Sequence, residues 1–396
     1  MIEHTNTPEL RFSEFKEEWI SKYVGEYFFF KNGLNKGKEF FGSGSPIVNF
    51  TDVFNNRGLY SKTINGKVSV TEKEINQFNV AKGDVFFTRT SEVIEEIGMP
   101  SVLLDHISDC VFSGFVLRAR EFNPGIFAES FKKYMFTTYN FRKEMIKKSS
   151  MTTRALTSGT AISNMVFIFP ENINEQRKIG DFFSKLDQQI ELEEKKLELL
   201  EQQKRGYMQK IFSQQLRFKD EKGNDYPKWI FKKFEEIFKV VPSKKYQIKS
   251  SEIEDNASIP VIDQGQNLIL GFSNNKEKVF NDFKNVIIYG DHTTVIKRSD
   301  KPFIIGGDGV KLLTSKVDSD ISYLYNALQY FNVKSEGYKR HFSILKNKDF
   351  YISTSIEEQK KIANIFNKLD KYIEKQFAKV ELLKQRKQGL LQKMFV

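Results

Sequence analysis

Two glycine-containing segments near the N-terminus resemble nucleotide- or cofactor-binding loops, but both patterns are incomplete. Residues 33–38 (GLNKGK) approach a phosphate-binding loop, but the segment is one residue short and Glu39 stands where Ser or Thr should follow. Residues 40–44 (FFGSG) have the glycines of a methyltransferase loop, but a polar segment precedes them and a predicted strand follows them. Because the sequence also has no Asn-Pro-Pro-aromatic tetrapeptide, it predicts neither activity for this chain.

The histidines and the cysteine do not form a metal-binding pattern. His4, His106, His292 and His341 are the only histidines, and their separations do not match the spacing of metal ligands. Cys110 is the only cysteine, which excludes both a disulfide framework and a thiolate metal site within the chain. We therefore expect no metal site.

The carboxylates are equally incomplete as catalytic groups. Asp84 and Asp291 each follow a glycine beside a predicted strand, but no second carboxylate is placed to share a metal or a proton with either. Residues 358–360 (EQK) match the end of a nuclease signature, yet they start a predicted helix whose second copy has Arg177 in place of the lysine. Residues 306–309 (GGDG) are more simply a turn between two strands. The sequence therefore predicts no active site.

Composition indicates a folded protein with an anionic partner. At 396 residues, with 38 phenylalanines and 39% hydrophobic residues, the chain should form two or three domains. The net charge of +11 favours nucleic acid as the partner over a membrane surface. No apolar run approaches the ~18 residues of a spanning helix, and the N-terminus lacks a signal-peptide pattern. We expect a cytoplasmic protein.

The strongest organising feature is a repeated segment. Residues 172–212 and 355–395 align without a gap, with roughly half of their positions identical. Both predict long helices, and the Asn172–Glu175 and Ser355–Glu358 spacings predict a capping box at each start.

Apolar residues recur in both copies in steps of three, four or seven, which is the pattern of a heptad seam. The same two positions interrupt the seam in each copy: Glu193 aligns with Gln376, and Lys204 aligns with Lys387. One such helix alone would more simply be an amphipathic core helix, but two copies with shared interruptions favour pairing with each other. The predicted helix-pairing residues are Ile179, Phe183, Leu186, Ile190, Leu197, Leu200, Ile362, Phe366, Leu369, Ile373, Val380 and Leu383.

A shorter repeat precedes each large irregular region. Residues 10–12 (Leu-Arg-Phe) followed by Trp19 resemble residues 216–218 followed by Trp229. We call residues 10–19 and 216–229 the lead-in segments. The chain thus reads twice as lead-in, mixed α/β region and long helix. The predicted domain boundaries are 1–171, 172–213, 214–354 and 355–396.

Hydrophobic runs bounded by glycine and polar residues predict the elements of the α/β regions. In the first region the expected strands are 46–50, 84–88, 110–118 and 165–169, with a helix over 127–148. In the second region the expected strands are 259–262, 286–289, 303–305 and 310–313.

Together these motifs resemble the specificity subunit of a Type I restriction–modification system. The resemblance rests on the two Glu-Gln-Arg/Lys-Lys-Ile helix starts, each leading into Phe-x-Lys-Leu-Asp, on the helix ends at 206–212 and 389–395, and on the lead-in segments. Residues 83–87 and 289–293 look like segments of the family's target recognition domains. The α/β regions otherwise match only loosely.

The resemblance implies a mixed α/β fold. Two target recognition domains would be separated by a pair of long antiparallel coiled-coil helices, with a pseudo-twofold internal repeat. Each domain would read one half of a split sequence in double-stranded DNA, and the helices would set the spacer length, as dimer geometry sets half-site spacing elsewhere. The helices and lead-in segments would dock two modification (methyltransferase) subunits, with motor and restriction subunits joining them. S-adenosylmethionine, ATP and Mg²⁺ would bind to the partner subunits, and this chain would not be an enzyme.

Candidate DNA-binding residues are mostly basic, amide or hydroxyl side chains, because such groups contact phosphates and base edges. They form two clusters in the first α/β region and four in the second. In the first region they are Arg89, Thr90, Ser91, Lys148, Ser149, Ser150, Thr153 and Arg154. In the second region they are Lys244, Lys245, Gln264, Gln266, His292, Thr293, Thr294, Lys297, Tyr338, Lys339, Arg340 and His341.

Two alternatives remain. A structural coiled-coil protein that bridges DNA would show no sequence preference. A self-contained methyltransferase or nuclease would show turnover from the isolated chain, although the sequence offers no residues for it.

Overall fold

The computed structural model describes residues 6–337 and 339–396 and divides into two compact units. The N-terminal unit comprises Met1–Glu193 together with Lys379–Val396, and the C-terminal unit comprises Glu194–Ala378. Each long helix therefore begins in one unit and ends in the other. Both units are mixed α/β, which confirms the predicted fold class.

The N-terminal unit is built on a mixed five-stranded sheet of order β2-β10-β6-β8-β4. These strands are β2 (Phe28–Asn32), β10 (Val116–Glu121), β6 (Val85–Thr88), β8 (Pro100–Leu103) and β4 (Gly58–Leu59). Three smaller sheets are β1 (Ile20–Tyr23) with β13 (Val166–Phe169), β11 (Ser150–Met151) with β12 (Ala155–Leu156) and β7 (Thr90–Ser91), and β5 (Lys67–Val68) with β3 (Phe41–Val48) and β9 (Val111–Phe112). The short helices are α1 (Phe50–Asn55), α2 (Glu72–Phe78), α3 (Glu129–Met135), α4 (Tyr139–Lys148) and α5 (Gly159–Ser163).

The C-terminal unit repeats this plan with fewer strands. Its antiparallel sheet β15-β22-β19-β20 consists of β15 (Phe238–Val241), β22 (Val310–Ser315), β19 (Ile287–Gly290) and β20 (Ile296–Lys297). A second sheet contains β16 (Gln247–Ile248), β21 (Ile304–Gly306), β17 (Ile259–Ile262) and β18 (Gly271–Ser273), and β14 (Ile230–Lys233) pairs with β23 (Asp349–Ile352). The helices are α7 (Phe234–Ile237), α8 (Ile321–Phe331) and α9 (Phe342–Leu345).

Equivalent elements hold equivalent places in the two units. The order β2-β10-β6-β8 matches β15-β22-β19-β20, and the ribbon β1–β13 matches β14–β23. In each unit this ribbon joins the strand that follows the lead-in segment to the strand that precedes a long helix. The internal repeat therefore extends beyond the two helices to the framework of both α/β regions, although their sequences differ.

Two predicted elements were wrong in the same way. The strand expected over residues 110–118 is two strands, β9 and β10, and the helix expected over 127–148 is two helices, α3 and α4. In the first case the hydrophobic run is broken at Gly114, where an added Cβ would lie 1.9 Å from the side chain of Asn35. In the second case Thr138 caps a new helix by accepting a hydrogen bond from the Phe141 backbone amide at 3.3 Å. Local polar groups thus ended elements that hydrophobic pattern alone would continue.

The turn predicted at residues 306–309 is confirmed. It connects two strands, β21 and β22, which belong to different sheets. Gly307 and Gly309 have φ values of 85° and 86°, a region that favours glycine. The glycines therefore serve to redirect the chain from one sheet to the next.

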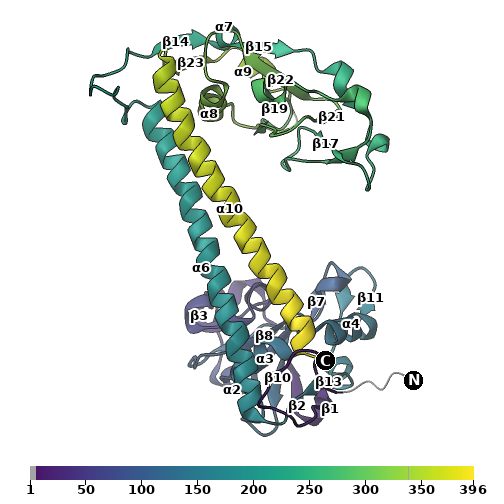
Figure 1. Cartoon of the computed structure of the whole chain (residues 1–396). Helices are drawn as coiled ribbons and strands as arrows, with labels where there is room; N and C mark the ends of the chain where they lie inside the picture. Colours follow the sequence, from purple (N-terminus) through teal and green to yellow (C-terminus); the bar gives the residue numbers. More distant parts are fainter. Residues whose placement is uncertain (1–5, 338) are drawn as a thin grey trace. The chain divides into compact units, whose positions relative to one another are not determined.

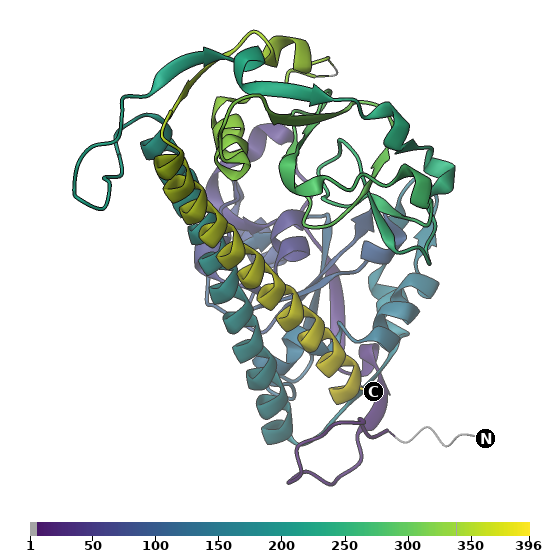
Figure 2. The ribbon, with the colours of Figure 1, turned by 45° about the horizontal axis from the view of Figure 1, so that its top comes forward.

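The two long helices, α6 (Ile173–Phe212) and α10 (Ile356–Met394), lie side by side and run in opposite directions (Figure 1 and Figure 2). In the N-terminal unit Lys387 forms an ion pair with Asp187 at 2.5 Å. In the C-terminal unit Lys204 forms an ion pair with Asp370 at 2.6 Å. These two pairs occupy equivalent positions of the repeat. The lysines that interrupt the predicted seam are therefore the residues that pair across the helices.

The predicted helix-pairing residues fall into two groups by their surroundings. Ile179 and Phe183 are fully buried in the core of the N-terminal unit, with Leu186 packed against it, and Ile362, Phe366 and Leu369 are buried in the core of the C-terminal unit. Ile190 and Val380 are also buried, at 9% and 2% exposed, whereas the other four are partly exposed: Leu197, Leu200, Ile373 and Leu383. The helix starts thus serve the α/β cores as well as the seam.

Reversing the charge of Lys204 should test the pairing in the C-terminal unit. Lys204→Glu places like charges beside each other at Asp370, and we expect the unfolding free energy to fall by about 1 kcal/mol, the upper range for a partly exposed pair. Urea unfolding followed by hydrogen–deuterium exchange would measure this loss. The double variant Lys204→Glu, Asp370→Lys should recover most of it, and failure to recover would show that the pair does not contribute to pairing.

Candidate nucleic-acid interface and its anchors

A buried glutamate fixes the start of α6 to the first lead-in segment. The carboxylate of Glu175 is fully buried and accepts hydrogen bonds from Nε and Nη2 of Arg11 at 2.6 and 2.8 Å. It also accepts one from the indole Nε1 of Trp19 at 3.2 Å. Because a charged buried carboxylate is costly unless it is paired and hydrogen-bonded, these three bonds hold it in one arrangement.

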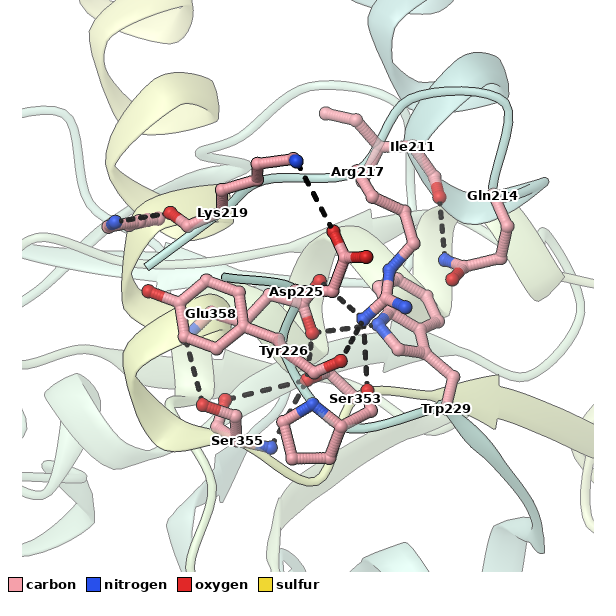
Figure 3. A network of polar contacts seen from close by, with 12 residues as sticks. Ile211, Gln214, Arg217, Lys219, Asp225, Tyr226, Trp229, Ser353, Ser355 and Glu358 are labelled. Atoms are coloured by element: carbon pink, nitrogen blue, oxygen red, sulfur yellow. Dashed lines mark hydrogen bonds and ion pairs between the residues drawn. The ribbon is translucent and has the colours of Figure 1, made fainter. Parts of the chain in front are cut away.

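The same anchor is repeated at the start of α10 (Figure 3). Glu358 is 1% exposed and accepts hydrogen bonds from Nη2 of Arg217 at 3.3 Å and from Nε1 of Trp229 at 2.9 Å. The hydroxyl of Ser353 donates a further bond at 2.6 Å. The Arg-Glu-Trp arrangement is therefore common to the two units, and it uses the residues that the two lead-in segments share.

The glutamine that follows each glutamate connects the helix to two further elements. Gln176 accepts a hydrogen bond from the backbone amide of Ala128, the N-cap of α3, at 2.9 Å, and donates one to the carbonyl of Pro170 at 2.8 Å. Gln359 accepts from the amide of Asp320, the N-cap of α8, at 2.9 Å. It donates to the Ser353 carbonyl at 2.8 Å. The Glu-Gln pairs thus tie each long helix to the lead-in, a domain helix and the last strand.

These contacts correct the predicted capping boxes. At α10 the Ser355 hydroxyl does accept a hydrogen bond from the Glu358 amide at 3.3 Å, but the Glu358 carboxylate is bonded to the lead-in side chains instead of returning to the N-cap. At α6 the Asn172 side chain accepts from the Asn174 amide at 3.0 Å, and the Glu175 carboxylate likewise binds the lead-in. Charged partners distant in sequence compete successfully with the local bond.

Each lead-in segment also contacts the end of the long helix that began in the other unit. The amide of Leu10 donates to the carbonyl of Lys393 at 2.8 Å, and the amide of Leu216 donates to the carbonyl of Lys210 at 2.9 Å. The four residues are equivalent in pairs across the repeat. The first contact joins opposite ends of the sequence, whereas the second is a local turn.

The phenylalanine at each helix end completes an aromatic cluster. Phe395 lies 6.0 Å from Trp19, 5.5 Å from Phe131 and 6.0 Å from Phe183, measured between ring centroids. In the C-terminal unit, Phe212 lies 5.8 Å from the ring of Trp229 in the equivalent arrangement. The core of each unit therefore contains residues from the start of one long helix and from the end of the other.

The candidate residues of the N-terminal unit come together in one small sheet. Residues 148–154 run from the last residue of α4 through β11 to the turn before β12, and residues 89–91 follow β6 into β7. Strand β12 joins them, because Leu156 pairs with both Ser150 and Thr90. Figure 1 shows β7 and β11 beside α4. Two candidate clusters that are far apart in the sequence thus form one surface.

The C-terminal unit also brings candidate residues together, with a different construction. Gln264 accepts a hydrogen bond from the His292 amide at 3.1 Å, and the Thr293 hydroxyl donates to the Gln264 carbonyl. Nδ1 of His292 lies 3.2 Å from the carbonyl oxygen of Lys339. His292 and Thr293 follow β19, which is equivalent to β6, whereas Gln264 follows β17 and Lys339 follows α8. The place after β6 and β19 therefore supplies candidate residues in both units, and the other candidates lie at places that differ between the units.

The model of the Type I restriction modification DNA specificity domain matches residues 16–202 and 226–383. The chain belongs to this family. The two matched ranges together cover most of the chain and correspond to the two repeats, so the family match and the duplicated anchors divide the chain in the same way.

The chain is similar in sequence to one specificity subunit and similar in fold to two solved structures. The chain is 33% identical over 93 residues to the Type I restriction enzyme EcoR124I/EcoR124II specificity subunit of Escherichia coli, and the alignment covers 23% of each chain. Its fold is similar to a crystal structure of the Type I restriction–modification system S subunit from M. genitalium, with a TM-score of 0.62, 16% identity and coverage of 98% of this chain and 99% of the other. A structure of a Type I R-M system assembly gives a TM-score of 0.51 at 15% identity, covering 95% and 97%.

Several candidate residues of this family member have structural partners inside the C-terminal unit. His341 is fully buried, and its ring accepts a hydrogen bond from the Glu336 amide at 3.0 Å. Lys297 is 5% exposed and donates to the Asp263 carbonyl at 2.9 Å. Burial lowers the pKa of Lys297 below its ordinary value, and Asp263 opposes that shift. A direct DNA contact by either side chain would require these bonds to open.

Ser91 is also buried, at 7% exposed, whereas the remaining candidates are at least partly accessible or lie outside the described residues. Lys244, Lys245, Gln266 and Arg340 are exposed or half-buried, and Tyr338 lies outside the described residues. In the N-terminal unit, Arg154 is exposed and forms only a surface ion pair with Glu92 at 3.6 Å, with their side chains 62% and 83% exposed. Such a pair contributes little, so Arg154 is available to a phosphate.

Sequence reasoning missed the anchoring role of Glu175 and Glu358. A sequence signal for this role was present, because arginine, tryptophan and glutamate recur together in both repeats. The local spacing predicted capping boxes for both glutamates instead.

Among residues 6–337 and 339–396, no group of three or more His, Cys, Asp or Glu side chains could hold a metal ion. No helix of this part of the chain is long and apolar enough to cross a membrane.

Proposed function

We propose that this chain is the DNA-recognising specificity subunit of a Type I restriction–modification complex. Each unit reads one half of a bipartite target in double-stranded DNA, and the paired helices set the length of the unread gap. The observation that carries the proposal is the duplication itself. Two units share the same anchors to the helices, while the loops they present differ in sequence and construction.

Charge and surface chemistry support DNA as the ligand. The chain has a net charge of +11, and each unit brings together hydroxyl, amide or basic side chains that are distant in sequence. Basic groups position a protein on phosphates, whereas hydroxyl and amide groups discriminate base edges. Two divergent loop sets on one repeated framework are suited to reading two different half-sites.

Catalysis and cofactors belong to the partners in this proposal. The helices and lead-in segments dock two modification subunits, which bind S-adenosylmethionine and methylate the DNA, and a motor–restriction subunit with ATP and Mg²⁺ completes the complex. The chain itself works in the cytoplasm as a non-catalytic subunit. The alternative, a coiled-coil protein that bridges DNA without sequence preference, has no use for two different loop sets.

Methylome sequencing of cells that express the chain with a modification subunit tests the proposal. We expect a bipartite methylated-adenine motif with a gap of fixed length. Arg340→Ala should weaken recognition of one half and Arg154→Ala the other, each reducing the salt dependence of DNA affinity by about one phosphate contact. Lys22→Ala is the matched control, because Lys22 lies on β1, outside the long helices, the lead-in segments and the candidate clusters, and forms a surface pair with Glu26.

Two results would contradict the proposal. Absence of new methylation, with the complex shown to assemble, would favour a bridging protein or another class of partner. Loss of both half-sites from either single variant would show that the two units do not read separately.

A further inference from the structure

The small sheet of the N-terminal unit buries one face where β12 meets β7, whereas Met151 on β11, which pairs with Ala155, is 50% exposed. Ala155 pairs with Ser91 across β12 and β7, and these residues are 0% and 7% exposed. Because neighbouring residues of a strand point to opposite faces, Leu156 and its partners Thr90 and Ser150 lie on the outward face. Leu156 is accordingly 42% exposed.

The outward face therefore presents one apolar side chain between two hydroxyls. Thr90, Leu156 and Ser150 stand in register across three strands. An exposed leucine needs no explanation by itself, but this one lies between two hydroxyl residues, and Arg154, two positions before it, is exposed and pairs at the surface with Glu92. The β11–β12 hairpin that carries it is a two-stranded ribbon, an element that the major groove of B-DNA admits.

A groove borders this face on one side. It has a volume of about 420 Å³ and is lined by Phe30, Lys31, Asn32, Arg89, Leu117, Ser158, Gly159, Thr160 and Ser163. Arg89 directly precedes Thr90 and Ser158 lies two positions after Leu156, so the groove adjoins the end of the sheet where β7 begins and β12 ends. Its lining offers a guanidinium, an amide and hydroxyls and contains no carboxylate.

The chemistry of the groove matches a DNA backbone lying beside a base-reading surface. Donors without acidic neighbours favour a phosphate, and Arg89 supplies a charge for it. Lys31 and Asn32 are neighbours in β2, so their side chains point to opposite faces of the sheet. Lys31 shares its face with its partner Arg118, and Asn32 shares the other face with Leu117. The Lys31 ammonium donates to the Gln77 carbonyl, so Lys31 lines the groove without serving as its cation.

We propose that the outward face of β7–β12–β11 reads the first half-site in the major groove, with Leu156 contacting the methyl group of a thymine. Thr90 and Ser150 contact polar base edges on either side, and Arg89 holds a phosphate in the adjoining groove. The major groove displays the thymine C5-methyl group to apolar side chains, whereas cytosine offers no equivalent. This inference rests on the proposed function and assigns a specificity-determining role to Leu156.

The C-terminal unit has no counterpart of this sheet among its described residues. Its clusters meet through loops around Gln264, His292 and Lys339 instead. The methyl-dependent contact is therefore expected in one half-site only, and the half-site read by the C-terminal unit serves as the comparison.

Uracil substitution tests the inference, because deoxyuridine differs from thymidine only by the missing methyl group. Once the motif is known, each thymine of a target duplex is replaced in turn and binding of the assembled methyltransferase complex is measured. For the wild-type chain we expect one replacement, in the half-site whose recognition Arg154→Ala weakens, to reduce affinity about fourfold, the value of one buried methyl group. Leu156→Ala should bind the thymine and uracil duplexes equally.

Val166→Ala is the matched control, since Val166 belongs to the same unit and is also 42% exposed. It should keep the wild-type sensitivity to uracil. Sequence-specific binding that is insensitive to every uracil in that half-site, or a sensitivity that Leu156→Ala retains, would overturn the inference and leave the proposed function standing. Binding without any sequence preference would overturn both.

Discussion

Phe395→Ala should lower the unfolding free energy of the N-terminal unit by about 3–5 kcal/mol, the range for removing a buried phenylalanine ring. Phe395 is 4% exposed and packs on Trp19, Phe131 and Phe183. The expected effect therefore appears in residues far from the substitution in sequence. Hydrogen–deuterium exchange of the intact chain would measure it, as faster exchange in peptides from β2, β6 and β10.

Phe212→Ala is the matched variant for this prediction. Phe212 is 2% exposed and contacts Trp229 and Tyr323 in the C-terminal unit. We expect it to accelerate exchange in β19 and β22 while leaving the N-terminal unit unchanged. Two results would contradict the packing of each helix end into the unit where the helix did not begin. One is an equal acceleration of hydrogen exchange in both units by both variants, and the other is unchanged hydrogen exchange in Phe395→Ala.

Removing the carboxylate of Glu175 should have a similar cost of about 3–5 kcal/mol, because it breaks a buried ion pair by deleting one partner. Glu175→Ala leaves the guanidinium of Arg11, which is 11% exposed, without its counter-charge, and leaves the indole N–H of Trp19 without its acceptor. Urea unfolding combined with exchange of the N-terminal unit would give the loss. The first lead-in segment should detach before the rest of the unit.

The control for this variant is Glu129→Ala in the same unit. Glu129 pairs with Lys82 at 3.1 Å, but both side chains are 40% exposed, so the loss should stay below about 1 kcal/mol. Equal losses from the two variants would mean that the buried anchor contributes no more than a surface pair. Glu358→Ala should reproduce the larger effect in the C-terminal unit.

The repeat made much of the architecture predictable. Periodic apolar residues over two matched segments predicted α6 and α10, because long amphipathic helices carry their pattern locally. The positions of the interrupting lysines, Lys204 and Lys387, were visible as well, but their partners were not. Asp370 and Asp187 lie far away in sequence, and only the antiparallel register brings each pair together.

The candidate interface was predictable in composition and unpredictable in geometry. Sequence reasoning selected Thr90 and Ser150 as polar residues beside predicted strands, and the structure joins them through β12. It did not select Leu156, because the candidates were chosen from basic, amide and hydroxyl side chains. Only the strand register shows that Ala155 faces inward and Leu156 outward, and a two-residue strand leaves no periodicity from which to infer this.

The division of the chain between units has a consequence for biosynthesis. The C-terminal unit consists of one continuous stretch, Glu194–Ala378, whereas the N-terminal unit also needs Lys379–Val396. A ribosome therefore delivers everything that the second unit requires before it delivers Phe395 to the first. Domains made first usually fold first, but here the earlier-made unit must wait with an unfilled aromatic site around Trp19 until the later-made unit is complete. The C-terminal unit would thus complete its fold before the N-terminal unit, although the N-terminal unit begins earlier in the messenger RNA.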